Sequence, residues 1–345
     1  MNRPLRQPRD LVEAGLASPA DLGTLEAVAS RYAVAITPAL AALIDPGDPA
    51  DPIARQFVPA AEELGSQPQE LADPIGDAAH SPVEGIVHRY PDRVLLKPVH
   101  VCAVYCRFCF RRETVGPGKA EALSPAALTR ALDYIRSRPE IWEVILSGGD
   151  PLVMSPRRLA EIMAALAGIE HVRIVRLHTR LPVADPDRIT PELIEVLKTP
   201  GQATWVVLHA NHARELTSAA RAACARLVEA GVPMLSQSVL LRGVNDDPDA
   251  LEALMRALVE TRIKPYYLHH GDLAPGTSHL RTSIPEGQGL MRAMRGRVSG
   301  LCQPTYVLDI PGGHGKAPIG PSCLEEVDGV ALLEDWQGGR HRYGE

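Results

Sequence analysis

The feature that most constrains this chain is a group of three cysteines, Cys102, Cys106 and Cys109, with the spacing CxxxCxxC. Thiolates are the usual ligands of iron–sulfur clusters and are also common at zinc. Three close thiolates can hold three irons of a 4Fe–4S cluster and leave the fourth iron free to bind a small molecule. A structural zinc site normally has four ligands, and the nearest further candidate, His100, lies too close to Cys102 along the chain to reach the same ion easily. We therefore predict a 4Fe–4S cluster, with a zinc site or three unliganded core cysteines as the alternatives.

The bulk composition excludes several classes of protein. Of the 345 residues, 45% are hydrophobic and 23% are charged, as in ordinary globular chains. The net charge of -6 gives no reason to expect binding to nucleic acid or to an anionic membrane. No apolar run reaches the roughly 18 residues of a membrane span, and the polar start of the chain does not resemble a secretory signal. We expect a cytoplasmic protein whose six cysteines stay reduced and form no disulfide framework.

The chain divides into three parts by its sequence pattern. Residues 1–88 contain short helical stretches separated by turn-rich segments such as 45–49, with no strong strand signal. They are predicted to form a helical N-terminal extension that wraps the main domain. Residues 89–325 alternate strand-like and helical stretches, which predicts parallel strands joined by crossover helices. Residues 326–345 are predicted to form a short C-terminal tail.

The alternating pattern predicts an α/β fold, an incomplete (βα)6 TIM-like barrel with a late seventh strand. The strand-like runs are 93–98, 143–146, 173–177, 204–208, 234–240, 265–269 and 305–308. The helical stretches are 124–136, 156–167, 191–198, 214–230, 248–260 and 287–297. Barrels of this type carry their chemistry at the carboxyl ends of the strands, so the loops after these runs are where we expect the site.

Clusters of polar residues follow the strand-like runs. After the second run, Gly148 and Gly149 permit close approach of the backbone to a ligand and Asp150 adds a carboxylate, although a lone GGD is often only a turn. Five histidines also stand near strand ends, where they are as typical of hydrogen-bonding pocket walls as of catalysis. These are His178, His209, His212, His269 and His270.

A glycine-rich loop near the end of the chain, Asp309-Ile-Pro-Gly-Gly-His-Gly-Lys316, is the second distinctive pattern. A lysine in a loop that approaches a ligand closely can form a Schiff base with pyridoxal phosphate. A flexible surface loop with a solvated lysine explains the pattern equally well. The loop is not a phosphate-binding P-loop, because Ile310 replaces its first glycine and Ala317 replaces the Ser or Thr after the lysine.

Together, the cysteines and the lysine loop resemble the lysine 2,3-aminomutase family of radical S-adenosylmethionine enzymes, and the similarity covers most of the chain. The matching segments are 88–93, 102–112 with the aromatic Phe108 before the third cysteine, Gln237, 266–272 and 311–316. The resemblance implies that the open iron binds S-adenosylmethionine and that one electron cleaves it to a 5′-deoxyadenosyl radical. It also implies that Lys316 carries pyridoxal phosphate. The further cofactor-binding residues that it implies are Arg89, Arg93, Gln237, Gly148, Gly149 and Asp150.

The same resemblance assigns the substrate-binding residues. It places Arg111 on the substrate carboxylate, which a guanidinium matches as a two-pronged donor. It places Asp272 and Asp309 on the remote ammonium of lysine, and two buried carboxylates facing one cation is reasonable chemistry. A glutamate enzyme would need a positive or neutral group there. The alternative is a pair of ordinary aspartates that form turns at strand ends.

The resemblance implies an isomerase that moves the 2-amino group of L-lysine to C3 and gives β-lysine. Its electron donor is expected to be a protein such as flavodoxin or ferredoxin, and a homodimer remains open. The segment Tyr267-Leu-His269 resembles a shorter branch of the family, one member of which makes β-lysine for elongation factor P. With only Cys323 near the end of the chain, we expect no intersubunit zinc. The remaining alternatives are an aminomutase for another amino acid and a non-catalytic iron–sulfur or zinc protein.

Overall fold

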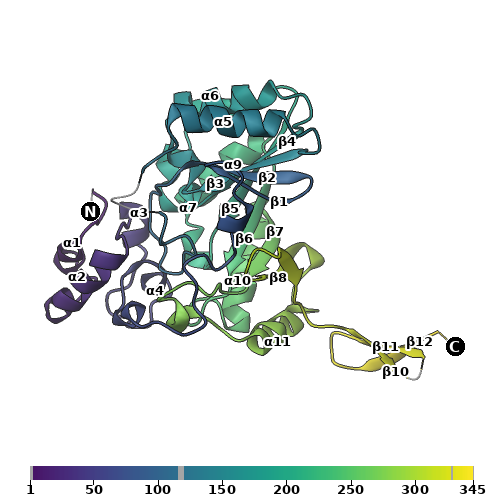
Figure 1. Ribbon diagram of the computed structural model, residues 1–345. Helices are drawn as coiled ribbons and strands as arrows, with labels where there is room; N and C mark the ends of the chain where they lie inside the picture. The colour runs from purple at the N-terminus through teal and green to yellow at the C-terminus, as the bar shows by residue number, and fades with distance from the viewer. Residues whose placement is uncertain (1–2, 116–119, 328, 345) are drawn as a thin grey trace.

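The computed structural model describes residues 3–115, 120–327 and 329–344. Its centre is a nine-stranded sheet in which neighbouring strands follow the order of the sequence. Strands β2 to β8 are parallel, and β1 and β9 add antiparallel edges. The strands are Ile86–Tyr90 (β1), Arg93–Val99 (β2), Glu143–Gly148 (β3), Ile174–Thr179 (β4), Ala203–His209 (β5), Met234–Val239 (β6), Lys264–His269 (β7), Thr305–Asp309 (β8) and Lys316–Pro318 (β9). The sheet curls as an incomplete α/β barrel, which confirms the predicted fold class (Figure 1).

Helices connect the parallel strands and cover the outside of the sheet (Figure 1). They are Pro125–Arg136 (α5), Pro156–Ala167 (α6), Leu181–Ala184 (α7), Pro191–Leu197 (α8), Ser218–Glu229 (α9), Pro248–Glu260 (α10) and Ile284–Met294 (α11). Most of them begin after a Ser, Thr or Asp whose side chain accepts a backbone hydrogen bond, and several carry proline in the first turn. Both features favour helix initiation, because they satisfy or remove backbone N–H groups that lack a partner within the helix.

Loss of one such cap gives a measurable prediction. The Ser124 hydroxyl accepts a hydrogen bond from the Ala127 amide at 3.1 Å and begins α5. Replacing Ser124 by alanine is expected to lower the free energy of unfolding by about 1 kcal/mol, measured as a shift of the urea midpoint. Ser137→Ala at the other end of α5 is the control, since that exposed hydroxyl donates to the Tyr134 carbonyl and caps no amide. Equal losses for the two variants would contradict the capping role.

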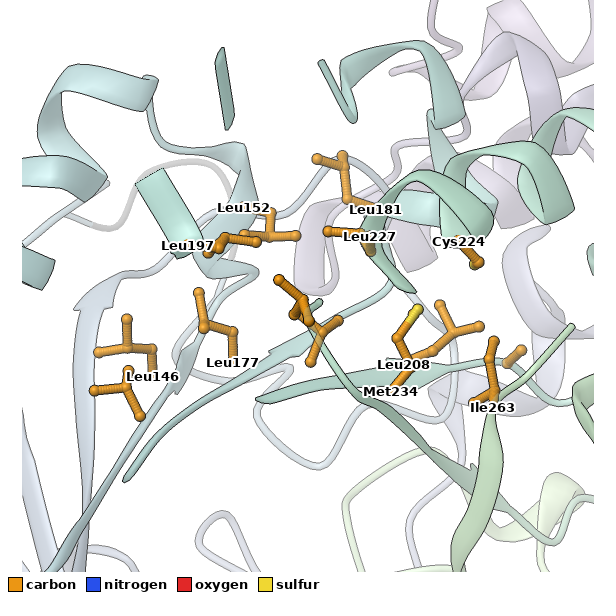
Figure 2. Packing of buried hydrophobic residues seen from close by; sticks show 14 of the residues in the cluster. Leu146, Leu152, Leu177, Leu181, Leu197, Leu208, Cys224, Leu227, Met234 and Ile263 are labelled. Carbon is orange, nitrogen blue, oxygen red and sulfur yellow. The ribbon is translucent and has the colours of Figure 1, made fainter. Parts of the chain in front are cut away.

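The side chains of the strands alternate between the outer core and the inside of the barrel. On β3, Val144 and Leu146 are fully buried in the main hydrophobic cluster under the helices. Ile145 and Ser147 point the other way and line an internal cavity. Figure 2 shows the packed layer, in which Leu146, Leu177 and Leu208 from successive strands meet residues of the surrounding helices. The period of two along each strand therefore separates the core that stabilises the barrel from the face that is free for chemistry.

The N-terminal extension has its own small hydrophobic core. It contains the short helices Pro8–Glu13 (α1), Leu22–Arg31 (α2), Pro38–Ala41 (α3) and Ala54–Phe57 (α4). Leu11, Ile36, Leu40 and Phe57 pack together there and also contact Ala184 of the barrel. The extension is not purely helical up to residue 88, as the sequence had suggested, because β1 begins at Ile86 and pairs with β2.

The C-terminal residues form an antiparallel sheet where a tail was predicted. Its strands are Leu324–Val327 (β10), Val330–Glu334 (β11) and Arg340–Tyr343 (β12). This sheet projects from the barrel beyond α11 (Figure 1). Within the described residues, no helix is both long and apolar enough to cross a bilayer.

Candidate active site

A cavity of about 260 Å³ opens inside the barrel at the carboxyl ends of the parallel strands. Every residue that the sequence predicted for the site lines it, although these residues come from distant parts of the chain. They are Arg89, Arg93, Cys102, Cys106, Cys109, Arg111, Gly148, Gly149, Asp150, Gln237, Asp272, Asp309 and Lys316. Three of the five strand-end histidines, His178, His209 and His269, also line the cavity. His212 and His270 do not line it. The His212 ring accepts a hydrogen bond from the Arg214 amide, and the His270 ring is hydrogen-bonded to the Tyr306 hydroxyl.

The loop with the three cysteines follows β2 and is held from behind by the N-terminal extension. The Tyr105 amide donates to the Ala35 carbonyl at 3.0 Å, and the Arg107 amide donates to the Gln56 carbonyl at 2.8 Å. The Arg107 side chain forms a buried ion pair with Glu63 at 2.5 Å. Since a loop of this kind has little regular structure of its own, these contacts fix its path. The extension is therefore part of the site.

The three thiols fit an iron–sulfur cluster. Burial raises the pKa of Cys102 well above its usual value, raises that of Cys106 to about 11 and also raises that of Cys109. Buried thiols of this kind are neutral at pH 7 unless a cationic centre stabilises the thiolates, which iron supplies. Among the described residues, no three His, Cys, Asp or Glu side chains converge on the position of a single ion. A 4Fe–4S cluster has no such requirement, because it spreads three thiolates over three irons.

The Gly148-Gly149-Asp150 segment brings the end of β3 against the start of the cysteine loop. Gly148 has a φ of +98°, and a Cβ on Gly149 would lie 2.3 Å from the Val101 carbonyl oxygen, so a larger residue would push the two segments apart. The Asp150 carboxylate accepts hydrogen bonds from the Thr179 hydroxyl at 2.7 Å and from the Arg180 amide at 2.7 Å. The carboxylate therefore ties the end of β3 to the end of β4 at the cavity wall.

Lys316 and Asp309 are direct neighbours across the antiparallel pair of β8 and β9. The Lys316 Nζ lies 2.6 Å from Asp309 Oδ1, and His269 Nδ1 lies 3.4 Å from Asp309 Oδ2. Although burial opposes ionisation, the hydrogen bond from His269 and the charge of Lys316 hold the pKa of Asp309 well below its usual value. The Lys316 amide donates to the Tyr90 hydroxyl at 2.7 Å. A Cβ on Gly315 would lie 2.7 Å from the same oxygen, which explains the glycine before the lysine.

Asp272 has a different electrostatic environment from Asp309. Its carboxylate lines the cavity, and within the described part of the chain no hydrogen bond or ion pair reaches it. Burial, followed by repulsion from Asp309, raises the pKa of Asp272 to about 7. A buried carboxylate that is destabilised in this way is stabilised when a cation enters the cavity beside it.

The arginines of the cavity are organised by Asp77, a residue that the sequence did not single out. Arg111 Nη2 donates to Asp77 Oδ2 at 2.7 Å, and Arg89 Nη2 donates to Asp77 Oδ1 at 3.3 Å. The pKa of Asp77 is lowered despite its burial, chiefly because Arg111 pairs with it. Arg93 lies over the Tyr90 ring at 3.9 Å. Asp77 belongs to the N-terminal extension, so no spacing motif around the cysteines or Lys316 could have identified it.

Comparison with known proteins decides the family. The Radical SAM superfamily matches residues 96–255. The chain is 43% identical to the L-lysine 2,3-aminomutase of Clostridium subterminale, over 90% of this chain and 75% of that protein. It is 42% identical to the enzyme of the same name from Fusobacterium nucleatum subsp. nucleatum, over 88% of this chain and 72% of that protein. The chain belongs to the lysine 2,3-aminomutase family of radical SAM enzymes.

Membership of this family makes the chain a radical SAM aminomutase, which is an isomerase. The 4Fe–4S cluster and S-adenosylmethionine follow from the family, in agreement with the prediction from the three cysteines. Family membership does not identify the substrate. The chain is also 37% identical to the glutamate 2,3-aminomutase of Clostridioides difficile, over 91% of this chain and 74% of that protein. The choice of substrate has to come from the side chains in the cavity of this aminomutase.

Proposed function

We propose that this aminomutase acts on L-lysine, moves its 2-amino group to C3 to give β-lysine, and carries pyridoxal phosphate on Lys316. The observation that carries the proposal is the pair of carboxylates, the half-buried Asp272 and the buried Asp309, in the same cavity as Lys316. Two carboxylates in one cavity fit a substrate with a second ammonium group, and they would repel the side chain of glutamate.

The residues around Lys316 suit pyridoxal phosphate. Two guanidinium groups, those of Arg89 and Arg93, line the same cavity and match the phosphate as donors. The Nε of Arg89 is buried without a hydrogen-bond acceptor in the described residues, so it is free to donate to a bound anion. When bound through a lysine amine, pyridoxal phosphate supplies a conjugated system that can carry the migrating nitrogen.

In this proposal the substrate is held at both ends. Arg111 binds the α-carboxylate. The Nε and Nη2 groups of Arg111 donate to Asp77 Oδ2 at 3.2 and 2.7 Å, and these hydrogen bonds fix the orientation of the guanidinium. Asp272 and Asp309 bind the far ammonium of lysine. A substrate fixed at both ends keeps its β-carbon in one position relative to the cluster side of the cavity. The buried walls keep water away from the reacting carbon.

Asp309 has two cationic partners in this scheme. In the structure its Oδ1 pairs with the charged amine of Lys316. Pyridoxal phosphate held on Lys316 would take this amine away from Asp309, and transfer of the cofactor to the 2-amino group of the substrate would free it again. Asp309 would then lie between the Lys316 amine and the far ammonium of the substrate, while His269 holds its other oxygen in place.

Turnover of three amino acids tests the proposal. The anaerobic, reconstituted enzyme receives S-adenosylmethionine, pyridoxal phosphate, a low-potential one-electron donor such as flavodoxin, and either L-lysine, L-arginine or L-glutamate. We expect β-lysine as the main product, a much slower reaction of arginine and no product from glutamate, followed by chromatography. Activity on glutamate alone would refute the assignment of Asp272 and Asp309. A protein with cluster absorbance but no turnover of any amino acid would instead support the non-catalytic alternative.

A further inference from the structure

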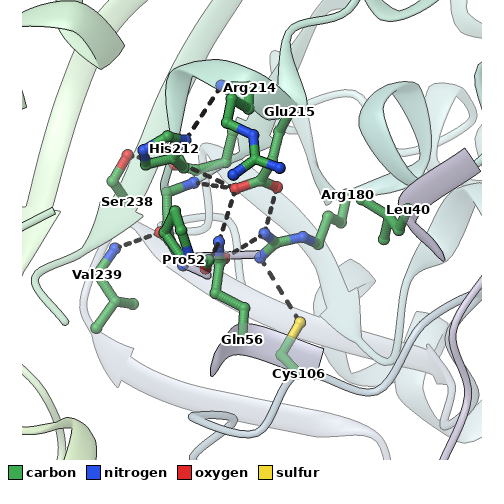
Figure 3. A network of polar contacts seen from close by, with 12 residues as sticks. Leu40, Pro52, Gln56, Cys106, Arg180, His212, Arg214, Glu215, Ser238 and Val239 are labelled. Carbon is green, nitrogen blue, oxygen red and sulfur yellow. Dashed lines mark hydrogen bonds and ion pairs between the residues drawn. The ribbon is translucent and has the colours of Figure 1, made fainter. Parts of the chain in front are cut away.

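A buried arginine, Arg180, lines the cavity and lies beside Cys106 of the cysteine loop (Figure 3). It follows β4, and its Nη1 donates to the sulfur of Cys106 at 3.6 Å. Its Nη2 donates to the Gln56 side-chain oxygen at 2.8 Å and also forms an ion pair with Glu215. One guanidinium therefore joins a predicted cluster ligand to a buried carboxylate.

Glu215 is itself held in place by the backbone, so the arginine cannot swing away from the sulfur. The Glu215 carboxylate accepts hydrogen bonds from the Asn211 amide at 2.9 Å and from the His212 amide at 3.0 Å. The Gln56 side-chain amide donates to the same oxygen at 3.2 Å. Glu215 is fully buried, which means that solvent does not screen its charge or that of Arg180.

Two aromatic rings flank the guanidinium. Its central carbon lies 4.8 Å from the centre of the Phe57 ring and 5.6 Å from the centre of the Phe108 ring. Phe57 comes from the N-terminal extension, whereas Phe108 stands between the second and third cysteines. The arginine is thus fixed in position by an ion pair, an amide and two ring faces.

The contact with Cys106 has an electrostatic consequence when the cysteine is an iron-bound thiolate. Reduction adds one negative charge to the cluster. A hydrogen bond to a ligand sulfur and a nearby positive charge both stabilise the reduced form, and these are established determinants of cluster potential. An arginine stays charged at every physiological pH, and its effect is largest where water is excluded.

We propose that Arg180 raises the reduction potential of the cluster through the Cys106 sulfur and that Glu215 offsets part of this effect. The pair then sets how readily an external one-electron donor reduces the cluster. The inference rests on the cluster alone and not on the choice of lysine as substrate or on pyridoxal phosphate. A purely structural role, in which Arg180 only joins the extension to the barrel, predicts no change in potential in a variant that keeps its cluster.

The test compares variants with opposite expected signs. Reconstituted holoenzyme without S-adenosylmethionine is titrated anaerobically against low-potential dyes, and the reduced cluster is measured by electron paramagnetic resonance. Arg180→Met should make the cluster harder to reduce, with about a tenfold lower ratio of reduced to oxidised cluster at a fixed potential, or about 59 mV for one electron. Glu215→Gln should shift the midpoint in the opposite direction, because it removes a nearby negative charge and leaves Arg180.

Two further variants separate the alternatives. The double variant Arg180→Met with Glu215→Leu removes both charges and the donor to sulfur, so its midpoint should lie between the wild-type value and that of Arg180→Met. Arg176→Met is the matched control and should not move the midpoint. Arg176 is a buried arginine of β4, the strand that precedes Arg180, and it pairs with Glu143 at 2.9 Å.

Iron and sulfide content is measured for each variant before titration. If Arg180→Met does not hold a cluster, Glu215→Gln and Arg180→Lys decide the question, since both keep a positive charge beside Cys106. An unchanged midpoint in Glu215→Gln, or shifts of the same sign in Glu215→Gln and Arg180→Met, would overturn the proposal.

Discussion

Replacing Lys316 by alanine is expected to abolish lysine turnover while the iron–sulfur cluster remains. The loss should be about 10³-fold or more, the scale expected when a covalent catalytic group is removed. The fold should tolerate the change, because Asp309 keeps its contact with His269 and lies 3.8 Å from Arg89. The measurements are β-lysine formation and the visible absorbance of protein-bound pyridoxal phosphate, both compared with cluster absorbance in the same sample.

Lys198→Ala is the control for this variant, since Lys198 is an exposed lysine that pairs with Glu195 at 2.8 Å. It should retain turnover and both absorbances. If Lys316→Ala kept the pyridoxal absorbance and lost only turnover, another amine would carry the cofactor. If it lost the cluster as well, the change would have disturbed the barrel and the assignment of Lys316 would need a second substitution, Lys316→Arg.

The sequence predicted the barrel well where local signals and burial agree. The stretch 156–167 coincides with α6, because Ser155 caps it and Pro156 begins it. The last helix was placed about three residues late, at 287–297, since α11 runs from Ile284 to Met294. Its true start follows Ser283, whose hydroxyl accepts from the Glu286 amide, and the chain leaves the helix at Arg295 with an extended backbone. Capping was the more reliable boundary signal in both cases.

The missed elements have weak local patterns. Strand β1 contains only two buried residues, Ile86 and Val87, before the polar His88 and Arg89, and its position depends on pairing with β2. The C-terminal strand β10 is exposed along its whole length, so no alternation of apolar and polar residues marks it. Such strands are fixed by their partners rather than by their own sequence.

The site separates in the same way into predictable and unpredictable parts. Spacing identifies the cysteines, the glycine-rich loop marks Lys316, and the resemblance to the aminomutase family implies the roles of Asp272 and Asp309. The residues that hold these groups in place come from remote segments. Asp77 reaches Arg111 across 34 positions, and Gln56 reaches Arg180 across 124. A position that matters through one long-range contact leaves no local motif.

Replacing Asp272 by asparagine is expected to lower kcat/KM for L-lysine by about 10²-fold or more. The reason is that breaking a buried ion pair by removing one partner costs about 3–5 kcal/mol, and the substrate ammonium is the proposed partner of Asp272. Asparagine has nearly the same shape, so the cavity and the cluster should remain. The measurement is the initial rate of β-lysine formation at several lysine concentrations, at pH values above and below 7.

The pH dependence of kcat/KM tests whether the charged form of Asp272 binds the substrate ammonium. The pKa of Asp272 is raised to about 7 by burial and by Asp309, so the carboxyl is neutral below this pH and charged above it. The ammonium binds the charged form. In the wild type, kcat/KM should therefore rise about tenfold per pH unit up to about pH 7 and then level off. Burial lowers the pKa values of His178 and His269 below 6.5, so their protonation occurs at lower pH than this rise.

In Asp272→Asn the rise below pH 7 should disappear, because the group responsible for it no longer titrates. Asp187→Asn, a change at an exposed aspartate outside the cavity, should keep the wild-type profile and serves as the control. A rise that persists unchanged in Asp272→Asn would assign it to another group and remove Asp272 from the binding site. If kcat/KM fell equally at all pH values and the rise persisted, Asp272 would support the shape of the cavity without binding the substrate ammonium. Only the loss of both the rate and its pH dependence agrees with an ion pair between this carboxylate and lysine.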